Sequence, residues 1–457
     1  MPRPNLLIVV SDTLRADALD CTDDAARTPQ LCGLAERGVF FERAYSNGPW
    51  TLPSSVSMFT GNVASAYLQR ADAPELPDDF LYIADRELLL AEALAAEGYD
   101  VVSFLETSIA AEPNTFQGFT QRETGPPNYP VREGLLPELR QSDPRYRQML
   151  GLLHYLLVAG DRSFFALQWI HDPHAVYLPP QHLFEQLTID ASRLTYPIPH
   201  YLSLGHQEDA DRGYRKLRDH QQELSEYDVE FLEALYLKEV ESVDERVGYV
   251  LDALERSGLA ERTFVVFTSD HGEAFGEHGH FLHGGVFYEE LVRVPLIIAG
   301  PGLPRGRRVE QAVSHVDLMP TLRDLMGVEC LGDPQGASFE ALLRGERDPA
   351  AARRQYLVDP TSRLEQRDAL VEGGWKLIAF RDGRRLELYD LRGDPGERHD
   401  VAAAHPELAA RMQAEIARLR TDSELRRERN RQLTNEDQLR RAGEETRAHL
   451  RALGYLD

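Results

Sequence analysis

The chain has few basic residues, and this shortage excludes one class of partner. Its 457 residues include 50 Lys and Arg against 75 Asp and Glu, which gives a formal net charge of -25 at pH 7. A phosphate backbone would be repelled by such a surface unless a local basic patch intervened. We therefore expect no nucleic acid partner, and the negative charge is most simply explained by solubility.

Cysteines are also scarce. The three in the chain, Cys21, Cys32 and Cys330, are an odd number and are widely spaced. A disulfide framework needs a dense, even set, and structural zinc sites need closely spaced pairs. The sequence therefore predicts three buried thiols.

Long apolar runs are absent. No stretch approaches the roughly 18 uninterrupted apolar residues that a membrane span requires. The first apolar run, Leu6 to Val10, begins so close to Met1 that a charged region, an apolar region and a cleavage site would not fit before it. We expect a cytoplasmic protein without a membrane segment.

Two apolar runs stop abruptly at side chains that can bind a metal. The run Leu6 to Val10 leads to Asp12, and the run TFVVFTS leads to Asp270 and His271. Uninterrupted apolar runs are typical of strands covered on both faces of a parallel sheet. Open α/β folds place their sites at the carboxyl ends of such strands. The sequence thus predicts an α/β fold in which these three side chains meet at one sheet edge.

A third apolar run, SFFALQWI, ends in a similar way. It leads to His171, Asp172, Pro173 and His174, whose side chains include possible ligands for a metal or an anion. Two histidines so close in sequence are often satisfied by local contacts, and that is the alternative interpretation.

The segment that begins at His271 is rich in histidine and glycine. It also holds His278, His280 and His283. A glycine-rich loop can bend several imidazoles toward one centre, whereas a helix could align only some of them. Exposure at the surface is the alternative for His278 and His280.

Hydroxyl groups gather in SNGPWTLPSSVSMFTG, residues 46–61. Pro53 is suited to the first position of a helix, because the N–H that it lacks is not needed there. Thr51 would then lie at a helix N-terminus, where the positive end of the dipole favours an anion. An ordinary capped helix after a proline turn is the alternative.

Periodicity and turn residues predict the surrounding elements. Helices are expected in TPQLCGLAERG, ELLLAEALAAEG, Tyr227–Gly258 and 403–457. Strands are expected in YDVVSFL, Val294–Ala299 and QYLVDP, and a hairpin in 368–392. Residues 111–147 and 180–225 lack periodicity and are expected to form surface insertions.

The order of motifs resembles the sulfatase family of the alkaline phosphatase superfamily. The similarity extends from residue 4 to about residue 402. It is carried by PNLLIVVSDTLRAD, TPQLCGLAERGVFFERAYSNGPWTLPSSVSMFTG, DPHAVYLPP, TSDHGEAFGEHG, HGGVFYEELVRVPLIIAGPG, SHVDLMPTL and ELYDLRGDPGERHDV, with LRALGYL at the end. Ordered motifs over most of the chain are more specific than any single motif.

The resemblance implies an α/β fold of the alkaline phosphatase type, with a mixed, mostly parallel sheet between helices. This sheet would belong to a catalytic domain of residues 1–335. Residues 336–457 would form a smaller α+β subdomain with a short antiparallel sheet and terminal helices. The boundary should fall between Cys330 and Gln355.

The matched positions also imply a divalent metal ion. Asp12, Asp270 and His271 fall where the family holds its metal. Thr51 falls where the family carries the nucleophile, which is also placed at the metal. Mixed oxygen and nitrogen donors favour zinc or manganese, whereas calcium prefers oxygen donors alone.

Two histidines fall where the family contacts its substrate. His174 takes the place of a histidine that holds the substrate oxyanion, and His283 takes the place of a lysine with a similar role. Both are therefore candidates for catalysis and substrate binding. Alternatively, they join Asp172 in a second metal site, so that the protein would hold two ions. Arg15 is a candidate anion contact, with a surface ion pair as the alternative.

The chain departs from the family pattern at the nucleophile. Sulfatases carry Cys or Ser there, in a motif that ends in Pro-x-Arg, and oxidise it to formylglycine. Thr51 cannot form that aldehyde and Ser55 replaces the arginine, so we expect no formylglycine. A second departure is Thr13, which stands where an Asp commonly follows the first metal ligand.

These features predict a metal-dependent hydrolase of small anionic esters. Phosphate mono- or diesters are the favoured substrates, because an ester of Thr51 has no second hydroxyl that could expel sulfate by collapsing to an aldehyde. One alternative is a sulfuric ester hydrolase or transferase that uses the unmodified hydroxyl. Another is a non-catalytic protein that only binds an anion, which the combined presence of metal-binding and histidine positions argues against.

Overall fold

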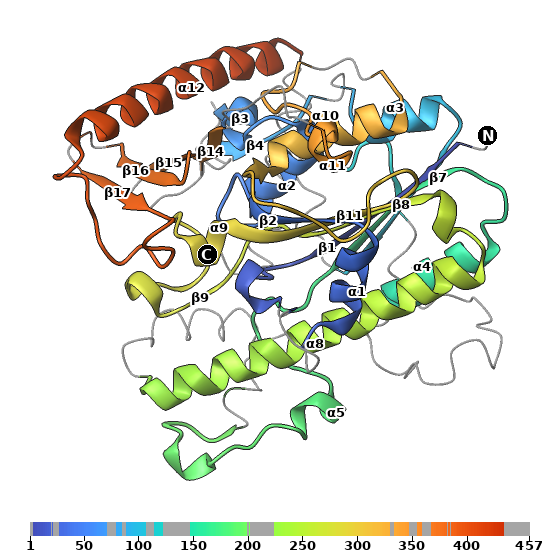
Figure 1. The fold of residues 1–457 in the computed structure, drawn as a ribbon, viewed down its shortest axis with the longest axis horizontal. Coiled ribbons are helices and arrows are strands. Elements are labelled where there is room, and N and C mark those ends of the chain that lie inside the picture. The colour runs from blue at the N-terminus through green and yellow to red at the C-terminus, as the bar shows by residue number, and fades with distance from the viewer. Residues whose placement is uncertain are drawn as a thin grey trace.

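A mixed sheet of nine strands forms the centre of the larger part of the chain (Figure 1). The structure, a computed structural model, describes residues 3–19, 21, 27–70, 79–84, 88–106, 114–121, 147–198, 201, 224–329, 333–346, 354–358, 367–381, 383 and 385–433. The strands of this sheet are β1 Asn5–Ser11, β2 Val39–Tyr45, β5 Asp100–Leu105, β6 Thr120–Gln121, β7 Phe164–Ile170, β8 Thr263–Ser269, β11 Arg293–Ala299, β12 Arg307–Val309 and β13 Val313–Ser314. Their order is β12-β2-β11-β8-β1-β7-β5-β6, and β13 also pairs with β2.

Strand β1 lies inside this sheet between two parallel neighbours. It pairs with β7 on one side and β8 on the other, and β5 and β6 continue the parallel part. Strand β11 runs antiparallel to both β8 and β2. Every residue of β1 is buried, as expected for an uninterrupted apolar run covered on both faces. The predicted mixed, mostly parallel sheet is confirmed.

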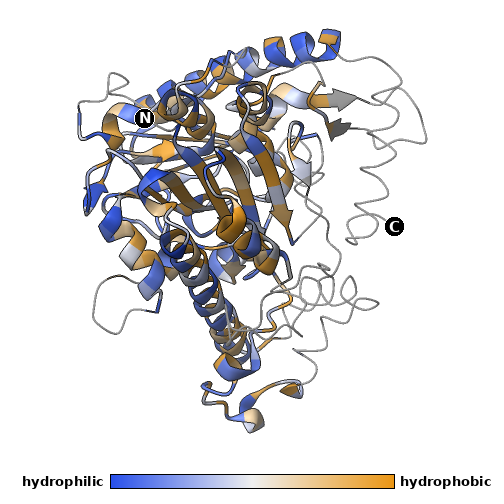
Figure 2. Ribbon diagram, turned by 90° about the vertical axis from the view of Figure 1, so that its right-hand side faces the viewer, coloured by the Kyte–Doolittle hydropathy of each residue, from blue (hydrophilic) through white to orange (hydrophobic). Residues whose placement is uncertain are grey.

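Helices cover both faces of the sheet. Helices α1 (Pro29–Arg37), α4 (Arg147–Val158) and α8 (Glu226–Arg256) share one core with Leu7 and Val9 of β1. Helices α3 (Leu90–Ala96) and α10 (His315–Met326) share the opposite core with Leu6 and Ile8. Figure 2 shows hydrophobic residues concentrated in the central strands between these helices. The alternation along β1 thus supplies two hydrophobic layers.

A smaller antiparallel sheet follows in the C-terminal part of the chain. Its strands are β14 (Arg354–Val358), β15 (Arg367–Glu372), β16 (Trp375–Phe380) and β17 (Leu386–Asp390). Helix α12 (Pro406–Leu433), at the top of Figure 1, packs on one face of this sheet through Met412 and Ile416. The other face packs against Val286 and Leu291 of the larger part. This separate sheet supports the division into 1–335 and 336–457, which we retain as a proposal.

The remaining α-helices and strands are short, apart from α2. They are α2 Thr51–Thr60, α5 Gln181–Phe184, α9 Glu289–Val292, α11 Glu340–Leu343, β3 Leu68–Arg70, β4 Asp79–Leu81, β9 Ala274–Phe275 and β10 Phe281–Leu282. The predicted insertion 111–147 contributes the edge strand β6, and its residues 122–146 lie outside the described residues. Residues 202–223 of the predicted insertion 180–225 lie outside them as well, as does the part of the predicted terminal helix beyond Leu433. None of the described helices has both the length and the apolar composition needed to cross a membrane.

Cys21 and Cys32 form a disulfide, so the prediction of buried thiols is wrong at these two positions. The segment after β1 returns to α1 and brings the two Cα atoms to 5.5 Å, although the residues are 11 apart in sequence. Cysteine spacing alone does not reveal such a contact. Cys330 lies outside the described residues. Disulfides persist mainly in oxidising compartments, so this one argues against the expected cytoplasmic location, which stays a prediction.

Candidate active site

The carboxyl ends of β1, β7 and β8 lie side by side at one edge of the central sheet. In the strand register, Ser11 of β1 pairs with Ile170 of β7 and with Ser269 of β8. The residues that come next, including Asp12 and Asp270, therefore leave the sheet at the same level. Strand register thus brings together side chains that are far apart in the sequence.

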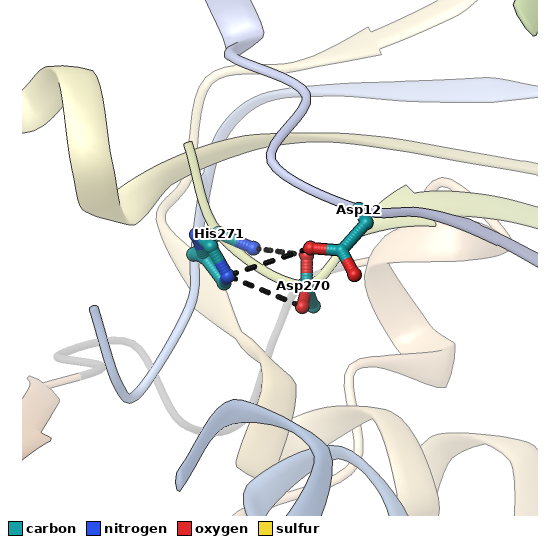
Figure 3. A group of neighbouring side chains, drawn as sticks. All are labelled: Asp12, Asp270 and His271. Atoms are coloured by element: carbon teal, nitrogen blue, oxygen red, sulfur yellow. Dashed lines mark hydrogen bonds and ion pairs between the residues drawn. The ribbon is translucent and has the colours of Figure 1, made fainter. Parts of the chain in front are cut away.

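Asp12, Asp270 and His271 form a group of potential metal ligands, which we call the sheet-edge group (Figure 3). Ligand atoms from the three side chains lie within 4.8 Å of one another. Nε2 of His271 is 3.6 Å from Oδ1 of Asp12 and 3.3 Å from Oδ2 of Asp270. The other ring nitrogen, Nδ1, lies 2.9 Å from the carbonyl oxygen of Gly272 and donates to it. Nε2 therefore carries the lone pair that faces the carboxylates.

Three of the four carboxylate oxygens in the sheet-edge group accept no hydrogen bond of normal geometry among the described residues. The fourth, Oδ1 of Asp270, accepts from the backbone N–H groups of Thr13 and His271. Neither oxygen of Asp12 accepts a hydrogen bond of normal geometry, and Oδ2 of Asp270 accepts none, although both side chains are fully buried. Burial, and then the charge of Asp270, raises the pKa of Asp12 well above its usual value, an effect that the indole N–H of Trp169 partly offsets. Burial lowers the pKa of His271 to about 4. A divalent cation would compensate this buried charge, and the donor set fits one.

Thr51 lies beside the sheet-edge group at the start of α2. Its Oγ1 is 3.3 Å from Nε2 of His271. The helix begins at Thr51, two residues before Pro53, which was the predicted first residue. One turn along, the hydroxyl of Ser54 donates to the carbonyl oxygen of Asp270 at 2.5 Å and ties the helix to the end of β8. The first N–H groups of a helix have no partners within it, so an anion is favoured at this position.

Three further histidine rings adjoin this group. The ring of His283 lies 4.6 Å from that of His271, measured between centroids, and 5.0 Å from that of His174. His171 stacks on His174 at 4.8 Å. Burial is the main reason why the pKa of His174 lies well below its usual value. The structure thus brings His174 and His283 into one cluster with His271, as the proposed substrate contacts require.

A buried carboxylate fixes the orientation of His283. Nδ1 of His283 is 2.9 Å from Oε1 of Glu273. The other oxygen of Glu273 accepts a hydrogen bond from the hydroxyl of Tyr177 at 3.1 Å. Because Glu273 is fully buried and held from two sides, it can keep the ring of His283 in one orientation.

Asp172, the candidate ligand of a second ion, forms an ion pair instead. Its Oδ2 is 3.2 Å from Nη1 of Arg246, which also contacts Glu106. Among the described residues, neither of the two groups of potential ligands includes Asp172, His174 or His283. A carboxylate that already neutralises an arginine is a weaker cation ligand, and the second ion stays a prediction.

Arg15 is also engaged by carboxylates. Its Nη2 is 2.8 Å from Asp17 and its Nη1 is 2.7 Å from Glu277, and the side chain is 13% exposed. This geometry fits the ion-pair alternative, so anion binding by Arg15 stays a prediction. Thr13, at the position of the expected second Asp, has a left-handed backbone with φ of 58°, and its buried hydroxyl makes no hydrogen bond among the described residues.

Three supporting residues were not singled out by sequence reasoning. Glu273 lies in the quoted motif TSDHGE and His315 in SHVDLMPTL, so both motifs contained a signal. Nδ1 of His315 is 3.1 Å from the hydroxyl of Ser54, and burial lowers the pKa of His315 to about 3. Arg246 gave no signal, because a single arginine on a long amphipathic helix resembles a surface residue.

Comparisons with known proteins identify the family and the fold. The model of the family described as Sulfatase matches residues 4–328, and that of the C-terminal part of N-sulphoglucosamine sulphohydrolase matches residues 276–422. Choline-sulfatase of Rhizobium meliloti is 25% identical over 437 residues, covering 88% of this chain and 82% of that protein. Arylsulfatase K of Bos taurus is 24% identical over 447 residues, covering 90% and 81%. The crystal structure of phosphonate monoester hydrolase of Agrobacterium radiobacter has the same fold, with a TM-score of 0.69, 20% identity, and coverage of 92% of this chain and 96% of that one.

Proposed function

The chain belongs to the sulfatase family, and we propose that it is a metal-dependent hydrolase that cleaves phosphate mono- or diesters with Thr51 as its nucleophile. The observation that carries this proposal is the position of the Thr51 hydroxyl. It stands at the first residue of α2, 3.3 Å from the same nitrogen of His271 that faces Asp12 and Asp270. The substrate would be a small anionic ester.

The residues around Thr51 fit a site for one divalent ion. Such an ion, held by Asp12, Asp270 and His271, would lower the pKa of the adjacent Thr51 hydroxyl and attract an anionic ester. Zinc or manganese suits these donors better than calcium, because an imidazole nitrogen is among them. Backbone N–H groups at the start of α2 would bind the oxygens of the substrate that do not react.

The proposed reaction has two balanced steps. In the first, the oxygen of Thr51 forms a bond to phosphorus as the bond to the leaving alcohol breaks, and the hydroxyl proton passes overall to the leaving oxygen. In the second, water attacks the phosphothreonine, the bond from phosphorus to Thr51 breaks, and a proton from water restores the threonine hydroxyl. His174 and His283 are the candidates for holding the proton and the substrate oxygens.

His283 and His174 would divide these tasks according to their surroundings. Glu273 contacts Nδ1 of His283 at 2.9 Å and holds that ring in one orientation, which suits a residue that positions the substrate. His174 lies beside it, and because burial holds its pKa well below the usual value, its neutral ring is available, as a weak base, to accept a proton from water in the second step.

Phosphate is favoured over sulfate because Thr51 lacks the second hydroxyl that a hydrated formylglycine carries. A formylglycine carries two hydroxyls in its hydrated form, so the second can expel sulfate and regenerate the aldehyde. A threonine ester has no such exit and must be broken by water at the phosphorus or sulfur atom. This requirement suits phosphoryl transfer, in which water commonly attacks a phosphoenzyme.

Hydrolysis of sulfuric esters by the same unmodified hydroxyl is the second candidate. It is supported by the relatives, because choline-sulfatase and arylsulfatase K are named for sulfate esters. Phosphonate monoester hydrolase, which shares the fold, supports the favoured phosphoryl reaction.

The ratio of kcat/KM values for matched substrates decides between the two. Aryl phosphate, phosphodiester, phosphonate and sulfate would be compared on the metal-loaded protein, with mass spectrometry of quenched samples to detect an ester on Thr51. We expect phosphoryl substrates to be preferred. A sulfate preference above about tenfold, or roughly 1.4 kcal/mol in transition-state binding, would overturn the proposal. Absence of turnover on all four would favour an anion-binding role.

A further inference from the structure

A second group of potential metal ligands lies where the larger part of the chain meets the C-terminal sheet. We call His278, Glu290 and Glu397 the junction group. Their ligand atoms lie within 4.8 Å of one another. His278 belongs to the turn between β9 and β10, Glu290 to α9, and Glu397 to the segment after β17. The group therefore joins three segments that are separate in the sequence.

The two carboxylates of the junction group are buried, and that of Glu290 is incompletely satisfied. The side chain of Glu290 is 7% exposed, and its Oε1 has no hydrogen-bond partner among the described residues. The side chain of Glu397 is fully buried. Its Oε2 accepts a hydrogen bond from the backbone N–H of Glu289 at 2.6 Å, and its Oε1 pairs with the ammonium of Lys376 at 3.0 Å. A buried oxygen without a donor, such as Oε1 of Glu290, is unfavourable unless a cation or a proton joins it.

The distances in the group suit a shared ion better than a direct hydrogen bond. Nε2 of His278 is 4.0 Å from Oε1 of Glu290, which is too long for a hydrogen bond. Ligand atoms about 2.0 Å from a tetrahedral zinc ion lie roughly 3.3 Å apart, so a small closure would complete the geometry. The ring of His278 stacks on Tyr288, with centroids 3.7 Å apart and planes 9° from parallel, which limits its orientation.

Charge also favours a cation. Lys376 is 3.0 Å from Glu397 and 3.1 Å from Glu289. This lysine therefore pairs with these two carboxylates and not with Glu290. Among the described residues, the carboxylate of Glu290 is therefore not neutralised by an ion pair with a lysine or an arginine.

We propose that His278, Glu290 and Glu397 form a zinc site that attaches the histidine-bearing loop to the C-terminal sheet. One imidazole nitrogen and two carboxylate oxygens are donors that zinc accepts, with water in the fourth position. The site would fix the turn that leads to His283 in the candidate active site. This role goes beyond the proposed function and does not rest on it.

Counting zinc ions per chain tests the proposal. Full-length protein is stripped with a chelator and titrated with zinc chloride by calorimetry, and the loaded protein is analysed for metal content. We expect the wild type to bind one ion more than Glu290→Gln or His278→Ala. The variant Asp12→Asn should lose the other ion, at the sheet edge, so failure of the proposed active site and failure of the junction site are seen separately.

The control is Glu277→Gln, which changes a carboxylate adjacent to His278 but outside the junction group; its zinc count should equal that of the wild type. Retention of the sheet-edge ion shows that a variant is folded. If Glu290→Gln and His278→Ala both bind as many ions as the wild type, the proposal is overturned, and a proton rather than an ion satisfies the buried oxygen of Glu290. A wild-type chain that binds only the ion lost in Asp12→Asn overturns it as well, even if the junction variants fail to fold.

Discussion

The sheet-edge group and the junction group contain the same donors in different surroundings. Each combines one imidazole with two carboxylates whose ligand atoms lie within 4.8 Å. The sheet-edge group stands at the ends of paired strands, whereas the junction group stands on a turn, a short helix and the segment after β17. Lys376 lies beside the junction group. Among the described residues, no lysine or arginine forms an ion pair with Asp12 or Asp270.

This difference indicates which group should bind a cation more tightly. Ladder hydrogen bonds fix the strand ends, so little order has to be created when an ion arrives. At the junction, a lysine already neutralises part of the charge, and three separate segments must hold their positions. We therefore expect higher affinity at the sheet edge, the proposed catalytic site, and lower affinity at the junction, the proposed structural site.

The largest effect is expected from removing the proposed nucleophile. Thr51→Ala should lower kcat for an aryl phosphate by about 10³-fold or more, as loss of a covalent nucleophile commonly does. Steady-state kinetics measures the loss, and zinc binding at both groups should remain. Ser57→Ala removes another hydroxyl of the same helix and should leave kcat close to the wild-type value. Comparable turnover by Thr51→Ala would transfer the role to a water molecule.

The next largest effect is expected at Asp172, whose carboxylate pairs with Arg246 and does not join the sheet-edge group. Asp172→Asn removes one of the two partners of buried Arg246 and should lower the free energy of unfolding by about 3 kcal/mol, since Glu106 remains. Urea unfolding measures this change. The matched control, Asp252→Asn, breaks an exposed pair with Arg256 and should cost less than about 0.5 kcal/mol. A lost metal ion with unchanged stability would instead support the second active-site ion predicted from the sequence.

Removing a ligand should weaken the sheet-edge ion. Asp270→Asn should reduce zinc affinity by more than about 100-fold, because even groups that only support a ligand contribute up to that amount. Competition with a chelator of known affinity measures it. Asp17→Asn, at a partner of Arg15 outside the group, should bind zinc normally. Prolonged chelation of the wild type should abolish turnover, and an undiminished rate in metal-free protein would contradict the metal-dependent reaction.

The smallest effect concerns pH and the junction group. Burial raises the pKa of Glu290 from 4.5 to about 7. Because the folded state holds this proton more tightly, the stabilisation is complete below the unfolded value and is lost as pH rises through about 7. Metal-free wild type should therefore lose about 2 kcal/mol of unfolding free energy between about pH 5 and pH 8 from this group.

Urea unfolding at the two pH values checks this expectation. Glu290→Gln has no carboxyl to titrate, so its stability should change less over the same range. Bound zinc should also remove the loss in the wild type, because the ion replaces the proton. Equal pH dependence in metal-free wild type and Glu290→Gln would show that the raised pKa makes no difference to stability.

The sheet and the sheet-edge group could be predicted from the sequence for a local reason. Runs such as Leu6 to Val10 are uninterrupted because both faces of the strand are covered, and the first polar residues after them mark the sheet edge. Asp12, Asp270 and His271 follow directly from this pattern. The family resemblance added Thr51, His174 and His283, which no periodicity singles out.

Contacts between side chains of different elements could not be predicted from the sequence. Arg246 lies in α8 and Asp172 follows β7, but their ion pair depends on how α8 crosses the sheet. The disulfide between Cys21 and Cys32 depends on how the chain returns after β1.

By itself, the sequence determined which residues end the main strands, where α1, α3, α8 and α12 run and which residue types are available for chemistry, whereas α4 and α10 were not predicted. These properties depend on neighbours within a few positions along the chain. The tertiary structure alone decided that Asp172 neutralises an arginine, that Glu273 orients His283, and that His278 meets Glu290 and Glu397. Each of these contacts joins side chains from separate elements, and a shift of a few ångströms in packing, which leaves the sequence pattern unchanged, would make or break it.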